Sequence, residues 1–361
     1  MRLFSRIILF NKCGADQLRH QLLELSAKDE PPVSCLITDA SWHFTQSVAD
    51  SLNLPRLVLR TSSQFCFLIC ASIPLLDDLG YFNLSDNIAT PLLEGLGYNN
   101  VPDNEHKLCF CPRKHLPESS GTPSRNWNSF SLKPFVVTFP HHVYLYHSRS
   151  ILQPHPAAAS SSLLDHDRSF FPWLDQQPRN SVVYISFGSV AQVEEKHFIE
   201  MVHGLVDSKH SFLWVVRPRF VCGSTWLEPL PDVFPGERGR IVKWAPQQEV
   251  LGHEAIGAFW THSGWNSTFE SVCEGVPVIC SPFWGDQPLD ARYVSDAWKV
   301  GVYLENGWKR EEITNAIRRV TEDEEMRERS RVLKQKLDAS MIEGGSSYES
   351  VESLVDYISS F

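Results

Sequence analysis

Residues 244–287 read WAPQQEVLGHEAIGAFWTHSGWNSTFESVCEGVPVICSPFWGDQ, and this stretch decides the fold. The apolar run 256–261 predicts a buried strand that ends at His262. Ser263-Gly264 predicts a tight turn into a helix over 265–274, and the run 277–281 predicts the next strand. Strand, helix and strand in this order are typical of a parallel sheet with crossover helices.

The turn at Ser263-Gly264 predicts an anion site. Backbone N–H groups and the positive helix end point at the carboxyl edge of the strand, where a pyrophosphate fits. Gly264 lets the backbone approach the anion closely. Asn266 and Ser267 add short polar groups to the first turn, where we also expect them to cap the helix. His262, as a neutral donor or as a cation, faces the same charge.

Further polar residues of the stretch fit the rest of a nucleotide sugar. Glu270 lies one turn along the helix, where its carboxylate can accept bonds from two ribose hydroxyls. Trp244 follows another predicted strand and offers a flat face to a base. Asp286 and Gln287 lie at the mouth of the site, where a carboxylate and an amide can bind sugar hydroxyls.

The stretch resembles the signature box of plant family 1 UDP-glycosyltransferases, which have the two-domain GT-B fold. The resemblance assigns the same roles to these positions and adds the Ala245 backbone and Gln247 to the nucleoside contacts. Phe187-Gly188-Ser189 matches a family segment whose Ser or Thr lies near the phosphates, which implicates Ser189. In similar proteins Gln at the last position is associated with glucose, so Gln287 favours UDP-glucose, and Trp265 agrees.

Outward from the box, strand and helix patterns continue in both directions. We predict an α/β chain of two Rossmann-like, doubly wound parallel-sheet domains, the N-terminal one incomplete. Strands are expected at 34–39, 55–60, 182–187, 212–217 and 240–243, and helices at 14–29, 44–53, 64–79, 193–208, 287–299, 309–321, 323–342 and 346–360. Residues 83–162 show no periodicity. The expected domains are 1–153 for the acceptor, 154–170 as linker, 171–345 for the UDP-sugar, and 346–361 as a helix packing back on the first domain.

The acceptor side matches the family only in part. Asp39 matches the Asp that orients the catalytic base, and Thr61 matches a residue near the transferred sugar. Both follow predicted strands, where ligands bind in open α/β sheets. The family's Gly-His loop, which supplies the base, has no counterpart in residues 1–29. His43 is a possible substitute, but its spacing from Asp39 places it a turn into a helix.

Composition excludes other classes of partner. With 33 Lys and Arg against 43 Asp and Glu, the formal net charge is -10, which disfavours nucleic acid and anionic membranes. Nine scattered cysteines indicate a reduced, cytoplasmic protein, and the short apolar run 7–10 indicates neither a leader nor a membrane span. His106, Cys109, Cys111 and His115 lack a second zinc-ligand pair, so we expect no metal. A nicotinamide oxidoreductase would need a Gly-x-Gly-x-x-Gly after a first strand, and none occurs.

The sequence thus predicts a monomeric enzyme that transfers glucose from UDP-glucose, without metal, to a small lipophilic acceptor such as a flavonoid, a terpenoid or a hormone-like molecule. Transfer is expected to invert the anomeric carbon. The alternative is a truncated, non-catalytic remnant that at most binds UDP-sugar, because the His loop has no counterpart.

Overall fold

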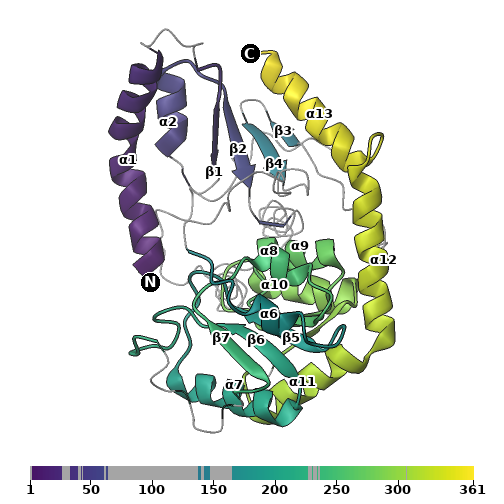
Figure 1. The fold of residues 1–361 in the computed structure, drawn as a ribbon. Coiled ribbons are helices and arrows are strands. Elements are labelled where there is room, and N and C mark those ends of the chain that lie inside the picture. Colours follow the sequence, from purple (N-terminus) through teal and green to yellow (C-terminus); the bar gives the residue numbers. More distant parts are fainter. Residues whose placement is uncertain are drawn as a thin grey trace, which may run out of the picture.

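Two sheets organise the chain, as the ribbon of the computed structural model shows (Figure 1). The structure describes residues 2–26, 33–39, 42, 44–60, 62–63, 137–139, 142–146, 165–226, 230, 234, 236–305 and 307–361. Within these ranges one sheet has four strands and the other has six. The fold prediction of an α/β chain with parallel sheets is confirmed.

The six-stranded sheet is parallel throughout, in the order β10-β9-β8-β5-β6-β7. Its strands are β5 (Val182–Ser186), β6 (Ser211–Val215), β7 (Gly239–Val242), β8 (Ile256–Thr261), β9 (Val278–Cys280) and β10 (Gly301–Tyr303). Every residue of β5, β8 and β9 is buried. The prediction omitted β10, because three residues carry too little pattern to distinguish a strand from a loop.

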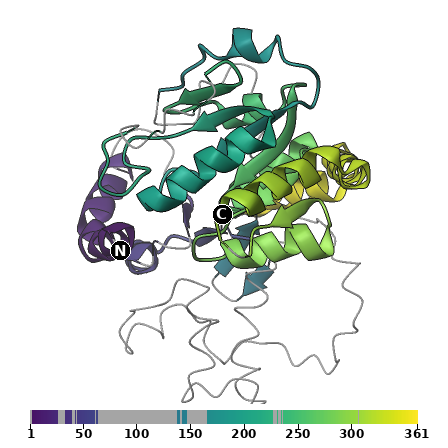
Figure 2. The same ribbon diagram turned by 90° about the horizontal axis from the view of Figure 1, so that it is seen from below.

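Helices cover both faces of this sheet, which makes the unit doubly wound. They are α6 (Phe171–Leu174), α7 (Glu195–Ser208), α8 (Gln247–Leu251), α9 (Trp265–Glu274), α10 (Gln287–Arg292), the π-helix η4 (Tyr293–Ala297), α11 (Arg310–Glu322) and α12 (Glu324–Met341). Alternate residues of β5 enter different cores: Val183 and Ile185 pack with α7 and α11, whereas Val182 and Tyr184 pack with α8. Seen from below, α7 in teal and α11 in yellow-green lie on the same face (Figure 2).

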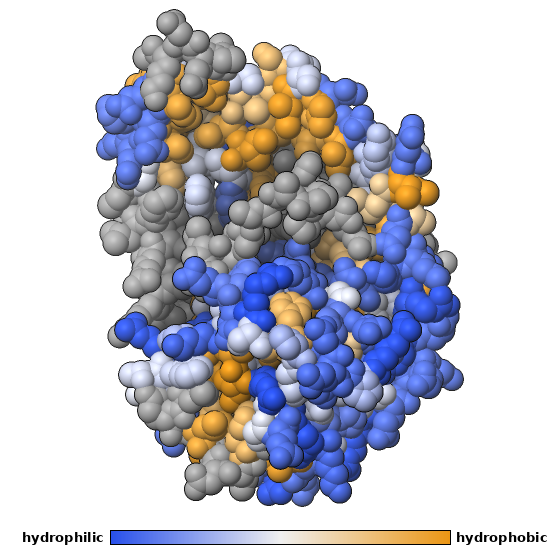
Figure 3. Space-filling view, in the orientation of Figure 1, coloured by the Kyte–Doolittle hydropathy of each residue, from blue (hydrophilic) through white to orange (hydrophobic). Residues whose placement is uncertain are grey.

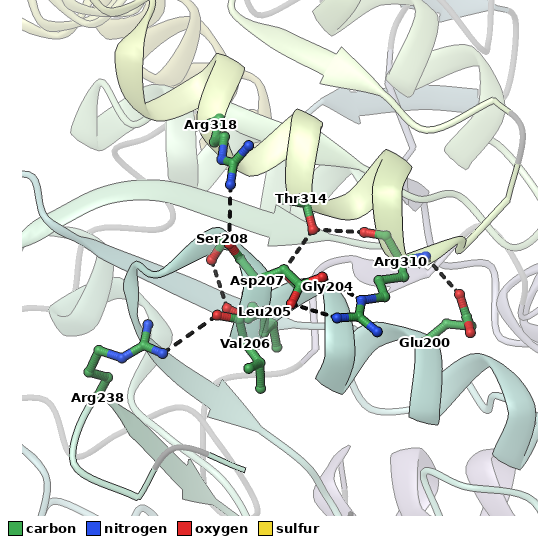
Figure 4. Close-up of polar contacts among 10 residues, drawn as sticks. All are labelled: Glu200, Gly204, Leu205, Val206, Asp207, Ser208, Arg238, Arg310, Thr314 and Arg318. Atoms are coloured by element: carbon green, nitrogen blue, oxygen red, sulfur yellow. Dashed lines mark hydrogen bonds and ion pairs between the residues drawn. The ribbon is translucent and has the colours of Figure 1, made fainter. Parts of the chain in front are cut away.

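Polar contacts fasten α7 to α11 (Figure 4). The Arg310 guanidinium binds the Asp207 carboxylate through two nitrogens, one of them at 2.8 Å. The Thr314 hydroxyl donates to the Gly204 carbonyl at 3.1 Å. Arg318 donates to the Asp207 carbonyl at 3.3 Å, in the last turn of α7. A cation there satisfies a helix-end carbonyl and opposes the negative end of the helix dipole, so these side chains have a structural role.

The four-stranded sheet has the order β1-β2-β4-β3. It comprises β1 (Leu36–Asp39), β2 (Arg56–Arg60), β3 (Val137–Phe139) and β4 (His142–Tyr146), beside the helices α1 (Arg2–Ser26) and α2 (Phe44–Ser51). β1, β2 and β4 are parallel, whereas β3 is antiparallel to β4.

Two expectations about this unit were wrong. β3 and β4 lie within 83–162, where no periodicity was found, because strands of three and five residues next to irregular sequence give no countable alternation. The first helix begins at Arg2, not near residue 14, so it takes in the apolar run 7–10. The helix expected at 64–79 lies outside the described residues, as does most of the expected linker.

The last helix, α13 (Ser346–Ser359), returns to the four-stranded sheet (Figure 1). Leu354 and Ile358 pack against Leu57 of β2, which is almost fully buried. Apolar residues gather on the surface of this upper unit, whereas the lower unit is mostly polar (Figure 3). Among the residues that the structure describes, no helix is both long enough and apolar enough to cross a membrane.

Candidate nucleotide-sugar site

Most of the predicted site residues lie at one edge of the six-stranded sheet. Because all its strands are parallel, their carboxyl ends meet at that edge. His262 directly follows β8, and the segment 187–189 follows β5, its neighbour in the sheet. Asp286 and Gln287 come after β9 on the other side of β8, and Trp244 comes after β7. In Figure 1 the helices α8, α9 and α10 lie on the side that faces the four-stranded sheet.

The turn between β8 and α9 has the predicted geometry. Ser263 adopts a positive φ of 61°, and α9 begins at Trp265 with Gly264 as its N-cap. The cap residue makes no side-chain hydrogen bond, so the expectation that Asn266 and Ser267 cap the helix was wrong. They lie inside the first turn, past the position from which a side chain caps. The N–H groups at this helix end therefore point outward without a side-chain cap, as anion binding requires.

The His262 ring lies between two glycines. A Cβ atom on Gly188 would lie 2.9 Å from the ring Cε1, and one on Gly264 would lie 2.6 Å from Nε2. On the other edge, Nδ1 and the Thr261 hydroxyl are 3.1 Å apart. Burial lowers the pKa of His262 to about 4, and a hydrogen bond with the Ser186 backbone opposes this change to a smaller extent. The imidazole is therefore neutral at pH 7, which is one of the two charge states considered from the sequence.

Glu270 is the centre of a hydrogen-bonded group next to this turn. The Gln247 amide donates to the Glu270 carboxylate at 2.6 Å and to the Ser267 hydroxyl at 3.0 Å. Gln248 donates to the other Glu270 oxygen at 3.2 Å. Burial raises the pKa of Glu270, and the two amide donors partly offset that rise. The Tyr184 hydroxyl donates to the Gln247 oxygen at 3.4 Å, so the group is anchored in the core.

Gln287 is buried and its oxygen is already engaged. It accepts the backbone N–H groups of Phe283 at 2.8 Å and Trp284 at 3.2 Å. The amide oxygen therefore shapes the 283–287 loop, and the NH₂ group is the part left to donate to a ligand. Asp286 is half-buried at the start of α10, directly before Gln287.

The remaining predicted donor residues surround the same edge. Ser189 is exposed, Ala245 is buried, and Asn266 is exposed on the first turn of α9. Trp244 is half-buried against the core under α8, and its carbonyl accepts the Asp167 N–H at 3.1 Å. Trp265 contacts other rings, with its centroid 6.0 Å from that of Phe269 and 6.2 Å from that of Trp298. Its indole thus packs within the helix layer.

On the acceptor side, Asp39 lies at the carboxyl end of β1, as predicted, and its side chain is half-buried. Thr61 and His43 lie outside the described residues, as do His106, Cys109, Cys111 and His115. In the described ranges, no group of three or more His, Cys, Asp or Glu side chains could hold a metal ion.

Some residues of the site were missed from the sequence. Gln248, Tyr184 and Arg217 were not singled out, although each contacts a predicted site residue or its loop. A doubled Gln after Pro246 and an Arg directly after an apolar strand were the available signals. Asp290 was missed as well: it is 1% exposed, and burial and the nearby Asp286 carboxylate raise its pKa.

Comparison with known proteins agrees with this geometry. The family described as UDP-glucoronosyl and UDP-glucosyl transferase matches residues 133–336. The chain is 57% identical over 374 residues to UDP-glycosyltransferase 76G1 of Stevia rebaudiana, covering 98% of this chain and 81% of the relative. It is 39% identical to UDP-glycosyltransferase 76B1 of Arabidopsis thaliana, with coverages of 92% and 78%.

Solved structures share the fold. A UDP-glucose:anthocyanidin 3-O-glucosyltransferase in complex with UDP superposes with a TM-score of 0.75 at 24% identity, covering 98% of this chain and 81% of that one. Os79 from O. sativa in complex with UDP gives a TM-score of 0.70 at 24% identity, with coverages of 98% and 84%. The chain therefore belongs to the plant family 1 UDP-glycosyltransferases, a family of transferases with the GT-B fold.

Proposed function

We propose that this chain transfers glucose from UDP-glucose to a hydroxyl group of a small lipophilic acceptor, with inversion at the anomeric carbon. One observation carries the donor half of this proposal. The uncapped start of α9, the neutral His262 ring and the Gln247–Glu270 group lie together at the carboxyl edge of one parallel sheet. Such an edge is where open α/β sheets bind nucleotides.

The diphosphate is assigned to the turn between β8 and α9. Its charge is met by the helix end, by His262 as a neutral donor, and by the hydroxyls of Ser189 and Ser267. These groups neutralise a diphosphate without a cation, so we propose no metal for this reaction. In this proposal Asn266 donates a further hydrogen bond to the diphosphate. Gly264, which has no side chain, allows the backbone to approach the diphosphate closely.

The nucleoside and the sugar are assigned to the two flanks of the turn. The base stacks on Trp244 beside the Ala245 backbone, and Glu270, oriented by Gln247, accepts the ribose hydroxyls. Asp286 and the NH₂ group of Gln287 bind glucose hydroxyls, and Trp265 supports that end of the helix. The engaged Gln287 oxygen supports a donor role, because the amide is held in a single orientation.

The reaction forms a bond from the acceptor oxygen to the anomeric carbon and breaks the bond from that carbon to the UDP oxygen. The acceptor proton leaves to a base, and the electron pair of the broken bond remains on UDP. Groups that face the diphosphate stabilise this departing charge. Asp39 is assigned to orient the base, and Thr61 is assigned to the sugar.

We assign acceptor binding to residues 1–153, linkage to 154–170 and donor binding to 171–345, with 346–361 as a brace. The packing of Leu354 and Ile358 on Leu57 supports the assignment of residues 346–361 as a helix that packs against the acceptor-binding part. A monomer in the cytoplasm fits best, since the free thiols of Cys273 and Cys280 are buried in the core, as in reduced proteins.

A second candidate is a truncated, non-catalytic remnant that at most binds UDP-sugar. It is favoured by one observation: residues 2–26 form a helix, so this segment does not form the strand and His-bearing loop that the resemblance leads us to expect. Asp39 would then have no base to orient.

Two measurements separate the candidates. Calorimetric titration with UDP, UDP-glucose and UDP-galactose tests the donor site, and we expect UDP-glucose to bind more tightly than UDP-galactose. Product analysis with an anthocyanidin, a trichothecene and pterostilbene, acceptors named for structural neighbours, tests transfer. Binding without product supports the remnant, and a chain that binds no uridine nucleotide refutes the proposed transfer of glucose.

A further inference from the structure

The loop that follows β5 is held from behind by an arginine outside the predicted site. Arg217 lies two residues past the end of β6, the strand beside β5. Its Nε donates to the Gly188 carbonyl at 3.2 Å, and its Nη2 donates to the Ala191 carbonyl. Both carbonyls belong to the loop that contains Ser189. One guanidinium therefore connects the segment after β6 to the loop after β5.

Arg217 makes no ion pair with an acidic side chain among the residues that the structure describes, and burial lowers its pKa. A guanidinium nevertheless remains a cation in proteins. A half-buried cation whose hydrogen bonds, within the described ranges, go to two carbonyl oxygens attracts an anion on the far side of the loop. The diphosphate assigned to this edge is such an anion.

The same contacts orient the loop. In a trans peptide the carbonyl and the next N–H point in opposite directions. Fixing the Gly188 carbonyl on Arg217 therefore turns the Ser189 N–H away from Arg217, and Ser189 itself is exposed. Gly188, at a φ of 68°, also lies against the His262 ring. The Arg217 guanidinium thus contacts the 187–191 loop, and that loop in turn contacts the His262 ring.

We propose that Arg217 is a positioning residue for the donor diphosphate. It holds the 187–191 loop against His262, directs the Ser189 N–H and hydroxyl toward the phosphates, and supplies a fixed positive charge behind them. It does not itself touch the substrate. This inference rests on the proposed function, because it takes the diphosphate to bind at the turn between β8 and α9.

The test compares ligands that differ only in phosphate. Uridine, UMP and UDP are titrated calorimetrically into the native chain, Arg217→Met, Arg217→Lys and the control Arg219→Met. Arg219 is exposed in the same loop, so its loss changes the net charge equally without touching the 187–191 loop. We expect Arg217→Met to bind UDP about tenfold to a hundredfold more weakly while uridine affinity stays within about twofold. Arg217→Lys, which keeps the charge, should fall between, and Arg219→Met should match the native chain.

Equal loss of UDP and uridine affinity in Arg217→Met, or no loss of either, overturns the inference. Thermal melting shows whether that variant is folded. If it is not, Arg217→Lys decides, since an unchanged ratio of UDP to uridine affinity there refutes the role. A native chain that fails to bind UDP refutes the proposed function instead, so the two failures are distinguishable.

Discussion

Replacing Gly264 by Ala should damage ligand binding far more than folding. The backbone at Gly264 has φ -62° and ψ 142°, which alanine adopts without strain. The new Cβ, however, would lie 2.6 Å from His262 Nε2, whereas ordinary contact begins near 3.4 Å. The ring must therefore shift by about 0.8 Å, and Gly188, which also lies against the ring, limits that shift.

The magnitudes follow from these contacts. Exchanging a glycine N-cap for alanine costs up to about 1 kcal/mol of stability, equivalent to a fall in Tm of about 2–4 °C. Displacing a donor from a bound anion costs about 1.5–3 kcal/mol, or roughly tenfold to 150-fold in UDP affinity. Calorimetry with UDP and a thermal melt measure the two effects on the same sample.

The matched control is Gly236→Ala, where an added Cβ meets nothing within 4 Å. It should change neither UDP affinity nor Tm appreciably. Native UDP affinity in Gly264→Ala would refute the assignment of His262 to the diphosphate. A fall in Tm of more than about 10 °C would instead show that the turn supports the fold as a whole.

Three other perturbations test the buried groups of the same edge. The depressed pKa of His262, about 4 in the fold against 6.5 unfolded, predicts that about 2–3 kcal/mol of stability is lost as pH falls from 6.5 to 4. Urea unfolding at pH 7 and 4.5 should show a smaller difference in His262→Gln than in the native chain. For Asp290, burial and Asp286 raise the pKa, so stability is lost as pH rises above the unfolded value of 3.8. Asp290→Asn should therefore raise Tm by a few degrees at pH 8 and by less at pH 5, and equal shifts would contradict this. Gln247→Met removes a donor from the Glu270 carboxylate and should cost about 1–3 kcal/mol in urea unfolding, and a cost below about 0.5 kcal/mol would show that the contact is dispensable.

Local pattern was sufficient for the core of the site. The strand at 256–261 and the helix at 265–274 have the predicted bounds, because a continuous apolar run, a two-residue turn and a helical repeat are all written within twenty residues. The tight turn at Ser263-Gly264 was also predicted, but its positive φ lies at Ser263 and not at the glycine, which the sequence did not indicate. Parallel pairing then brings the predicted residues to one edge without further information.

Contacts between segments that are distant in the sequence could not be predicted from the sequence alone. Arg217 reaches back 29 residues to Gly188, and Tyr184 reaches 63 residues to Gln247. Asp290 cannot be recognised as a buried carboxyl group beside Asp286 until the segments around it are placed. The short strands β3 and β4 could not be predicted for the same reason, because each forms by pairing with a neighbouring strand in the sheet.

The sequence by itself determined the alternation of strands and helices, the turn before α9 and the set of polar residues around it. The reason is that backbone conformation and apolar periodicity act over a few residues. Only the tertiary structure decided that His262 is neutral, that the Gln287 oxygen is engaged and that Arg217 stands behind the loop. Burial and the direction of a hydrogen bond depend on which chain segments pack together, and no local pattern encodes that packing.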